Sequence, residues 1–227
     1  MKRAVALGFF DGVHLGHQAL LKTLCEQEAY RSVWTFSNHP FSVLAPERTP
    51  FFLSAPEEKE ALLKAFGAQE VMMPVFDQTM AQMTAESFCG YLFETLQASV
   101  VIAGVNHQFG KNAGGNAETL VQAAKRYGAQ AVIVQEVRWR GQPVSSSRIR
   151  LALEQGNVGL AAQLLGRPYR IPVFEFEREG AFVTQRHRAL PKDGVYRVES
   201  AFGETTVYIQ NRKILPEGKI SNQISFL

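Results

Sequence analysis

The first two thirds of the chain alternate short apolar runs with longer amphipathic segments. The apolar runs are too short for surface helices and carry too few polar residues for half-exposed strands, which indicates strands buried on both faces. Five such strands are predicted, at residues 4–7, 32–36, 70–75, 99–103 and 131–135. Four helices are predicted between or after them, at residues 16–30, 55–66, 85–97 and 117–127. This alternation predicts an α/β fold with a doubly wound, mostly parallel five-stranded sheet.

The pattern changes near residue 168. Two short helices precede the change, at residues 146–155 and 157–165. Beyond it, the runs become short and alternating with glycines between them, as in a small β structure. Strands are predicted at residues 173–177, 181–184, 195–200 and 205–209. We therefore expect an α/β domain over residues 1–168 and a small β segment over residues 169–227.

Composition narrows the class of protein. With 227 residues, 46% hydrophobic and 20% charged, the chain has room for a large and a small globular part. Its 24 Lys and Arg against 21 Asp and Glu give only +3, so nucleic acid is not expected as a partner. No apolar run approaches the length of a membrane span, and no membrane partner is expected. The oligomeric state is left open.

Cysteine usage indicates a reducing compartment. Cys25 and Cys89 lie in apolar, helix-like contexts without the spacing of a metal or redox motif. We expect two reduced, partly buried thiols and a cytoplasmic protein. Two basic strings, at residues 138–140 and 186–188, are interpreted as exposed hairpin charge, with nucleic-acid binding as the alternative.

The segment GFFDGVHLGH, residues 8–17, lies where the first predicted strand passes into the first predicted helix. Ligands of doubly wound sheets bind at such strand ends, where a helix N-terminus offers free N–H groups to an anion. His14 and His17 can face one ligand from the first turn, and Gly12 and Gly16 allow close backbone approach. Two polar residues at a helix start are the structural alternative, and zinc would need further clustered ligands. A phosphate site is predicted.

Three further segments follow other predicted strands. VSSSRIR, residues 144–150, starts a helix with hydroxyls and an arginine fork suited to phosphate, although an ordinary serine cap with solvated arginines is the commoner meaning. In TFSNHP, residues 35–40, the proline holds His39 extended at a strand end. GVNHQFGK, residues 104–111, follows the fourth strand, with a plain mobile loop as the alternative.

Together these segments resemble the adenylyltransferase module of bacterial FAD synthetase, the riboflavin kinase/FMN adenylyltransferase family. That family belongs to the Rossmann-like HxGH nucleotidylyltransferases. The similarity spans roughly residues 4–168, and its pieces occur in the family's order. They are LGFFDGVHLGHQ, TFSNHP, SAPEEK, Phe76-Asp77, AESF, AGVNHQFG, VSSSRIR and LLGRP.

The resemblance implies transfer of AMP from ATP to FMN, giving FAD and pyrophosphate, with Mg²⁺ through ligands that it does not identify. It implies catalytic roles for His14, His17 and Arg148. The residues that it places on ATP are Gly8, Phe10, Asp11, Gly12, Gly16, Ser146, Ser147 and Arg148. Those that it places near the flavin or in the crevice are His39, Asn106, His107 and Phe109. Such a transfer needs alignment and charge stabilisation, and no covalent nucleophile.

The chain departs from the family in two regions. Asn38 stands where the family has Pro, Phe9 where it has Asn, and Ser147 where it has Thr, while residues 106–108 are Asn-His-Gln where it has Asp-Phe-Arg. Two alternatives therefore stay open. The chain could act on an acceptor other than FMN, or it could be a catalytically silent relative that binds flavin or nucleotide. Between Pro168 and Pro191 the family's kinase motif GFPTAN is missing. A truncated β remnant without riboflavin kinase activity is expected there.

Overall fold

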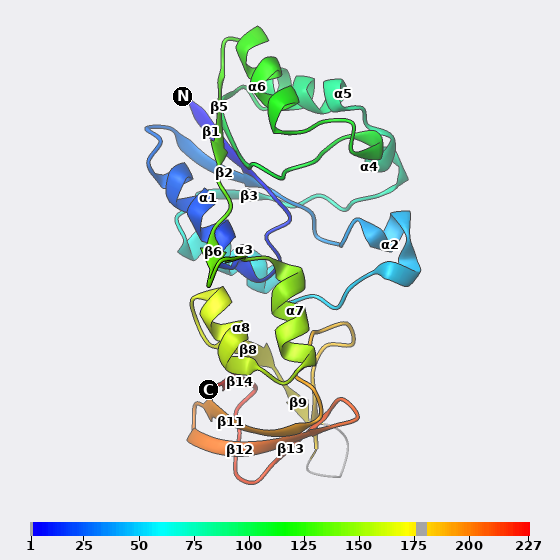
Figure 1. Ribbon diagram of the computed structural model, residues 1–227, viewed down its shortest axis with the longest axis vertical. Coiled ribbons are helices and arrows are strands. Elements are labelled where there is room, and N and C mark those ends of the chain that lie inside the picture. Colours follow the sequence, from blue (N-terminus) through cyan, green and yellow to red (C-terminus); the bar gives the residue numbers. More distant parts are fainter. Residues whose placement is uncertain (1, 176–180) are drawn as a thin grey trace. The chain divides into compact units, whose positions relative to one another are not determined.

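The computed structural model describes residues 2–175 and 181–227 (Figure 1). The chain divides into two compact units, which are treated separately below. Unit 1 comprises Met1–Pro50 and Pro56–Pro143, and unit 2 comprises Phe51–Ala55 and Val144–Leu227. The boundary predicted at residue 168 marks where the resemblance to the family's adenylyltransferase module ends. It stays a prediction.

Unit 1 is built on a parallel five-stranded sheet with the order β3-β2-β1-β4-β5, which confirms the predicted doubly wound class. The strands are β1 (Arg3–Leu7), β2 (Tyr30–Trp34), β3 (Glu70–Met72), β4 (Ala98–Gly104) and β5 (Gln130–Val134). β2 starts and ends two residues before the predicted strand because Tyr30 pairs with Arg3. β3 is shorter than predicted and stops before Pro74, which has no N–H for a ladder.

Helices cover both faces of this sheet (Figure 1). They are α1 (Leu15–Cys25), α3 (Pro56–Ala65), α5 (Ala85–Gly90) with a π-helical turn at Tyr91–Thr95, and α6 (Ala117–Arg126). Leucines of α1 and α3, such as Leu21 and Leu63, pack in one core cluster. Phe88 of α5 and Leu120 of α6 pack in the other. α1 ends five residues before the predicted helix because the chain must already be extended at Tyr30 to enter β2.

The hydrophobic pattern missed the shortest elements of unit 1, since two to five residues carry no clear period. They are α2 (Phe41–Leu44), α4 (Gln78–Gln82), β6 (Arg138–Trp139), β7 (Gln142–Pro143) and the 3₁₀ turns at Asp11–Val13, Pro46–Arg48 and Lys111–Ala113.

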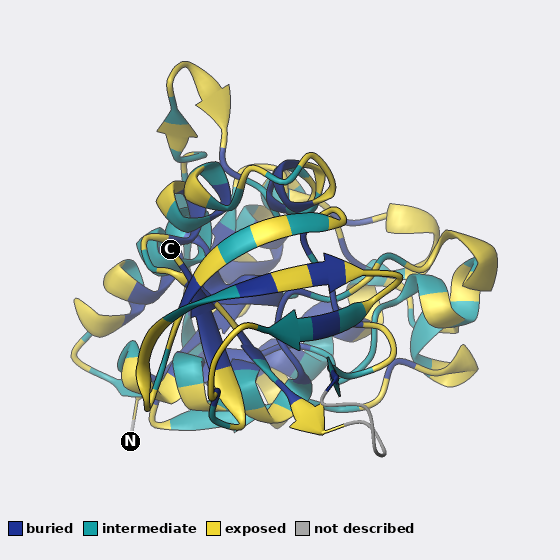
Figure 2. Ribbon diagram, turned by 90° about the horizontal axis from the view of Figure 1, so that it is seen from below, coloured by how far each residue is buried: buried dark blue, intermediate teal, exposed yellow. Residues whose placement is uncertain are grey.

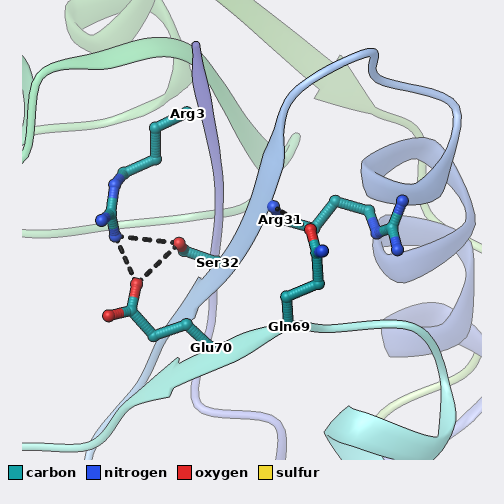
Figure 3. A network of polar contacts seen from close by, with 5 residues as sticks. All are labelled: Arg3, Arg31, Ser32, Gln69 and Glu70. Atoms are coloured by element: carbon teal, nitrogen blue, oxygen red, sulfur yellow. Dashed lines mark hydrogen bonds and ion pairs between the residues drawn. The ribbon is translucent and has the colours of Figure 1, made fainter. Parts of the chain in front are cut away.

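A polar network ties the first three strands together (Figure 3). The Arg3 guanidinium of β1 pairs with the Glu70 carboxylate of β3 and donates to the Ser32 hydroxyl of β2 over 3.0 Å. The Ser32 hydroxyl donates to the same carboxylate over 2.9 Å, and Ser32 is fully buried. Beside it, the Gln69 side-chain oxygen accepts from the Arg31 backbone N–H over 3.0 Å. These contacts fix the strand order on one side of β1.

The described residues of unit 2 form two helices and a seven-stranded sheet whose paired strands are antiparallel. The helices are α7 (Ser146–Glu154) and α8 (Val158–Leu165). The strands are β8 (Tyr169–Pro172), β9 (Phe174–Glu175), β10 (Phe182–Val183), β11 (Gly194–Ser200), β12 (Gly203–Gln210), β13 (Lys213–Pro216) and β14 (Gln223–Phe226). Figure 2 shows exposed residues interspersed with intermediate and buried ones along its longer strands. This confirms a separate β segment.

Three strands of unit 2 were not predicted, namely β8, β13 and β14. β13 and β14 are only four residues long, and their alternation is too brief to stand out. Of the strand predicted at residues 173–177, residues 176 and 177 lie outside the described residues.

Two expectations about exposure are wrong. Cys25 is exposed and Cys89 is buried, and both are free thiols. Arg188, expected as hairpin surface charge, is 1% exposed. Its guanidinium donates to the Tyr169 hydroxyl over 3.1 Å and to the Arg170 carbonyl over 2.5 Å. Burial with these acceptors makes Arg188 a structural cation of unit 2.

Over residues 2–175 and 181–227, no helix combines the length and the apolar character that crossing a membrane requires. The cytoplasmic location and the lack of a nucleic-acid partner stay predictions.

Candidate functional site

Three of the segments singled out in the sequence lie at one edge of the unit 1 sheet. β1 ends at Leu7 and leads into residues 8–17, β2 ends at Trp34 and leads to His39, and β4 ends at Gly104 and leads to His107. Because the strands are parallel, their carboxyl ends share this edge. The strand order reverses between β1 and β4, which is the usual ligand position in such sheets.

His14 and His17 form a stacked pair at the start of α1. His14 is the N-cap residue, and its Nδ1 accepts from the His17 backbone N–H over 3.3 Å. The two rings lie 3.6 Å apart at an interplanar angle of 15°. Because an accepting Nδ1 carries no proton, the neutral His14 ring carries its proton on Nε2. His14 therefore supplies an Nε2–H donor in the first turn of a helix.

The turn before this helix has an unusual backbone. Phe10, Gly12 and Val13 have φ values of 56°, 77° and 41°, which are left-handed conformations that only glycine adopts freely. Phe10 and Val13 are fully buried, and the Phe10 ring lies 5.0 Å from that of His17. The Gln18 side chain donates to the Val13 carbonyl over 2.9 Å. Burial thus holds a strained turn, a feature common at ligand sites.

Lys59 is a buried cation that sequence reasoning missed. It is 2% exposed, and its ammonium donates to the carbonyls of Phe36 over 2.6 Å and Phe9 over 3.2 Å. The ammonium also lies 4.3 Å from the Phe9 ring centroid. Burial lowers the Lys59 pKa to about 8, partly offset by the negative charge of Asp11. Its spacing in the sequence could have revealed its burial, because Lys59 precedes the buried Leu63 by one helical turn and therefore lies on the same face of the helix.

His39 joins the same group of side chains through Phe9. Its ring lies edge-on to the Phe9 ring at 4.8 Å, and its Nδ1 accepts from the Phe41 backbone N–H over 3.1 Å. By the argument used for His14, the neutral ring is protonated at Nε2. The fully buried Thr35 hydroxyl donates to the Phe9 carbonyl over 2.9 Å. The loops after β1 and β2 are thus joined by several contacts.

A cavity of about 450 Å³ lies beside these loops in unit 1. Its walls are mainly aromatic and aliphatic, as in pockets for planar organic ligands. The lining residues are Trp34, Phe36, Pro40, Leu44, Phe76, Met80, Ala81, Gln82, Met83, Phe88, His107, Gln108, Phe109, Gly110, Asn112 and Ala113. Phe36, whose carbonyl binds Lys59, and Pro40, which follows His39, connect the cavity with the histidine group.

Of the residues predicted to lie near the flavin, some line this cavity and others do not. His107 and Phe109 line it, with ring centroids 5.8 Å apart. Asn106 is exposed, is not among the lining residues, and donates to the Glu136 carboxylate over 3.4 Å. Asn38 holds the loop after β2 to that after β3, since its amide donates to the Phe76 carbonyl over 2.9 Å and accepts from its N–H over 2.7 Å.

The predicted second phosphate clamp lies in unit 2. Ser146, Ser147 and Arg148 form the first turn of α7. The N-cap is Ser145, whose hydroxyl accepts from the Arg148 backbone N–H over 3.2 Å. Arg150 donates to the Ser147 hydroxyl over 3.5 Å. Joint action of this turn with His14 and His17 stays a prediction.

Comparison with known proteins identifies the family to which the chain belongs. A family model described as FAD synthetase matches residues 1–148. The bifunctional riboflavin kinase/FMN adenylyltransferase of Escherichia coli strain K12 is 32% identical over 209 residues, covering 86% of this chain and 67% of that protein. The protein of the same name from Bacillus subtilis strain 168 is 30% identical over 214 residues, covering 88% of this chain and 67% of that protein.

A solved structure titled as a macrolide-efflux protein from Streptococcus pneumoniae is also similar. It matches with a TM-score of 0.85 and 25% identity, covering 100% of this chain and 85% of that one.

Replacing Lys59 by Met should remove a pH dependence of stability. The folded pKa, about 8, lies below the ordinary 10.5, so the unfolded chain holds more protons between these values. The free energy of unfolding should therefore rise with pH in this window, by about 3 kcal/mol relative to Lys59→Met. Urea unfolding at pH 7 and pH 10.5 measures it. Lys64→Met, an exposed lysine of α3, is the control, and parallel wild-type and Lys59→Met profiles would refute the account.

Proposed function

The chain belongs to the FAD synthetase family and is thereby a nucleotidyltransferase, and we propose that it transfers AMP from ATP to FMN without phosphorylating riboflavin. One observation carries the proposal. In unit 1, a helix-start histidine pair and an aromatic cavity lie at neighbouring loops of one sheet edge. The reaction needs one subsite for the phosphates of the donor and a neighbouring one for the ring system of the acceptor.

The phosphates of ATP bind at the start of α1. The backbone of residues 8–13 and the first turn of α1 supply N–H groups, and the glycines at 8, 12 and 16 let the chain approach closely. A phosphate oxygen of FMN attacks the α-phosphorus of ATP, and the bond to the bridging oxygen breaks, releasing pyrophosphate. His14 and His17 donate hydrogen bonds to the oxygens on which negative charge builds up.

The first turn of α7, in unit 2, is itself suited to phosphate. Ser146 and Ser147 present hydroxyls, and Arg148 presents a planar guanidinium that suits two phosphate oxygens at once. All three residues lie within the part of the chain that the family model matches.

Mg²⁺ fits this reaction as a companion of ATP. The ion prefers oxygen ligands and is commonly held by substrate phosphates with one or two carboxylates and water. Among the described residues, no cluster of three or more His, Cys, Asp and Glu suits a metal. We assign Mg²⁺ to the phosphate oxygens of ATP, where it would neutralise charge.

The ring system of FMN occupies the cavity of unit 1. Trp34, Phe36, Phe76 and Phe88 offer faces and edges for stacking on a planar heterocycle. His39 precedes the lining residue Pro40 and packs against the Phe9 ring, and we place it near the reacting phosphate of FMN. Asn106 is placed at the rim, held by Glu136.

We assign no riboflavin kinase activity to unit 2. The GFPTAN motif is missing between Pro168 and Pro191, although the PKDGVY string that follows it in the family continues into β11. A β segment that keeps a strand but lacks the phosphate-binding loop has lost the chemistry of phosphoryl transfer.

The direct test is a product assay with ATP, Mg²⁺ and either FMN or riboflavin, followed by chromatography. FMN should yield FAD, and riboflavin should yield no FMN. Formation of FMN from riboflavin would overturn the assignment of unit 2. Binding of flavin without turnover of FMN or another phosphate ester would show a silent carrier, and turnover of a different ester alone would show another acceptor.

His17→Ala tests the phosphate site. Loss of one donor that stabilises developing charge should lower FAD formation by about 100- to 1,000-fold. Steady-state turnover measures it, with circular dichroism as a check on folding. His187→Ala, an exposed histidine of unit 2, is the matched control and should keep wild-type turnover. An unchanged rate in His17→Ala would remove this histidine from the mechanism.

A further inference from the structure

Lys59 contacts two loops that belong to different parts of the candidate site. Its ammonium donates over 3.2 Å to the carbonyl of Phe9, which precedes the turn to His14. It also donates over 2.6 Å to the carbonyl of Phe36, a lining residue of the cavity. Lys59 lies on α3 and is only 2% exposed, so protein atoms cover it. It can act on a substrate only through the groups that it holds.

Phe9 receives several of these contacts at once. Its carbonyl also accepts from the hydroxyl of Thr35, a fully buried residue that follows β2, over 2.9 Å. Its ring centroid lies 4.3 Å from the Lys59 ammonium and 4.8 Å from the His39 ring. Loss of the ammonium would therefore release the backbone and the ring of Phe9 together.

The charge of Lys59 is not needed to fill space. Burial disfavours an ammonium and lowers the Lys59 pKa to about 8, although the negative charge of Asp11 offsets part of this effect. Apolar side chains of similar volume often replace buried charges without loss of stability, because they avoid the cost of removing a charge from water. The contribution of this charge is thus the fixed arrangement of its two acceptors.

Arg188 of unit 2 is a buried cation of a different kind. Its acceptors, the Tyr169 hydroxyl and the Arg170 carbonyl, belong to neighbouring residues of one strand, β8. Such a cation fastens its own segment to one strand. The acceptors of Lys59 come instead from two loops, of which one leads to the histidine pair and the other lines the cavity.

We propose that Lys59 is a positioning residue for nucleotidyl transfer, which sets the distance between the phosphate subsite at the start of α1 and the ring subsite in the cavity. The inference rests on the proposed function. Each subsite has binding groups of its own, the histidine pair and the aromatic walls. Loss of the ammonium should leave each subsite able to bind its substrate, while the two substrates lose the alignment that transfer requires.

The experiment compares Lys59→Met with the wild-type protein and with Lys64→Met, the same change at an exposed position of α3. Flavin fluorescence measures the Kd of FMN, titration calorimetry measures the Kd of ATP with Mg²⁺, and steady-state assays of FAD formation give kcat. In Lys59→Met, kcat should fall about 100-fold, as expected of a misplacement of about 1 Å, while both Kd values stay near wild type. Lys64→Met should match the wild type in all three quantities.

Thr35→Val loosens the same carbonyl without removing a charge. Valine lacks the hydroxyl that donates to Phe9, so kcat should fall about 10-fold with both Kd values unchanged. Because Lys59 and Thr35 act on one carbonyl, the loss of kcat in the double variant should be smaller than the product of the two single losses. Thr35→Val alone decides the question if circular dichroism shows that Lys59→Met does not fold.

The outcomes separate this inference from the proposed function. If the wild type forms FAD, an unchanged kcat in Lys59→Met, or in Thr35→Val where Lys59→Met does not fold, would overturn the role of Lys59 alone. A fall in kcat with weaker binding of both substrates would show general loss of structure and would also overturn it. Single losses that multiply in the double variant would contradict action through Phe9. A wild type that forms no FAD would overturn the proposed function and this inference together.

Discussion

The site depends on one buried positive charge. An ammonium that is 2% exposed must be met by oxygen atoms, and Lys59 reaches the carbonyls of Phe9 and Phe36, one from each of the loops that follow β1 and β2. Those loops cannot separate without leaving the ammonium unpaired in the interior, which costs several kcal/mol. A lysine from α3 thus fixes the spacing between the turn that leads to His14 and the loop that carries His39.

The same constraint links two subsites of different character. On one side of Lys59, the strained turn through Phe10 and Val13 leads to a helix start with stacked histidines, a surface suited to anions. On the other side, the Phe36 segment forms a wall of an aromatic cavity suited to a planar ring. Phosphates and heterocycle are the two ends of the reaction that the family performs, and proximity of such subsites is the main requirement of nucleotidyl transfer.

The sequence predicted the parallel sheet because its buried strands are short apolar runs, and it located the histidine pair because glycines and a helix start surround it. It did not reveal Lys59, since a lysine in an acidic, amphipathic helix is typical of a solvated face. Nor did it separate His107 from Asn106, which are neighbours in the chain yet differ in contact with the cavity. Arg188 was misjudged because its acceptors, the Tyr169 hydroxyl and the Arg170 carbonyl, come from residues that are distant in the sequence.

The central claim is that one site, in unit 1, binds the acceptor's ring in the cavity. A crystal structure of the protein with FMN tests this directly. The ring should lie among Trp34, Phe36 and Phe88, which line the cavity. A flavin bound to the β sheet of unit 2, with the cavity empty, would contradict the account.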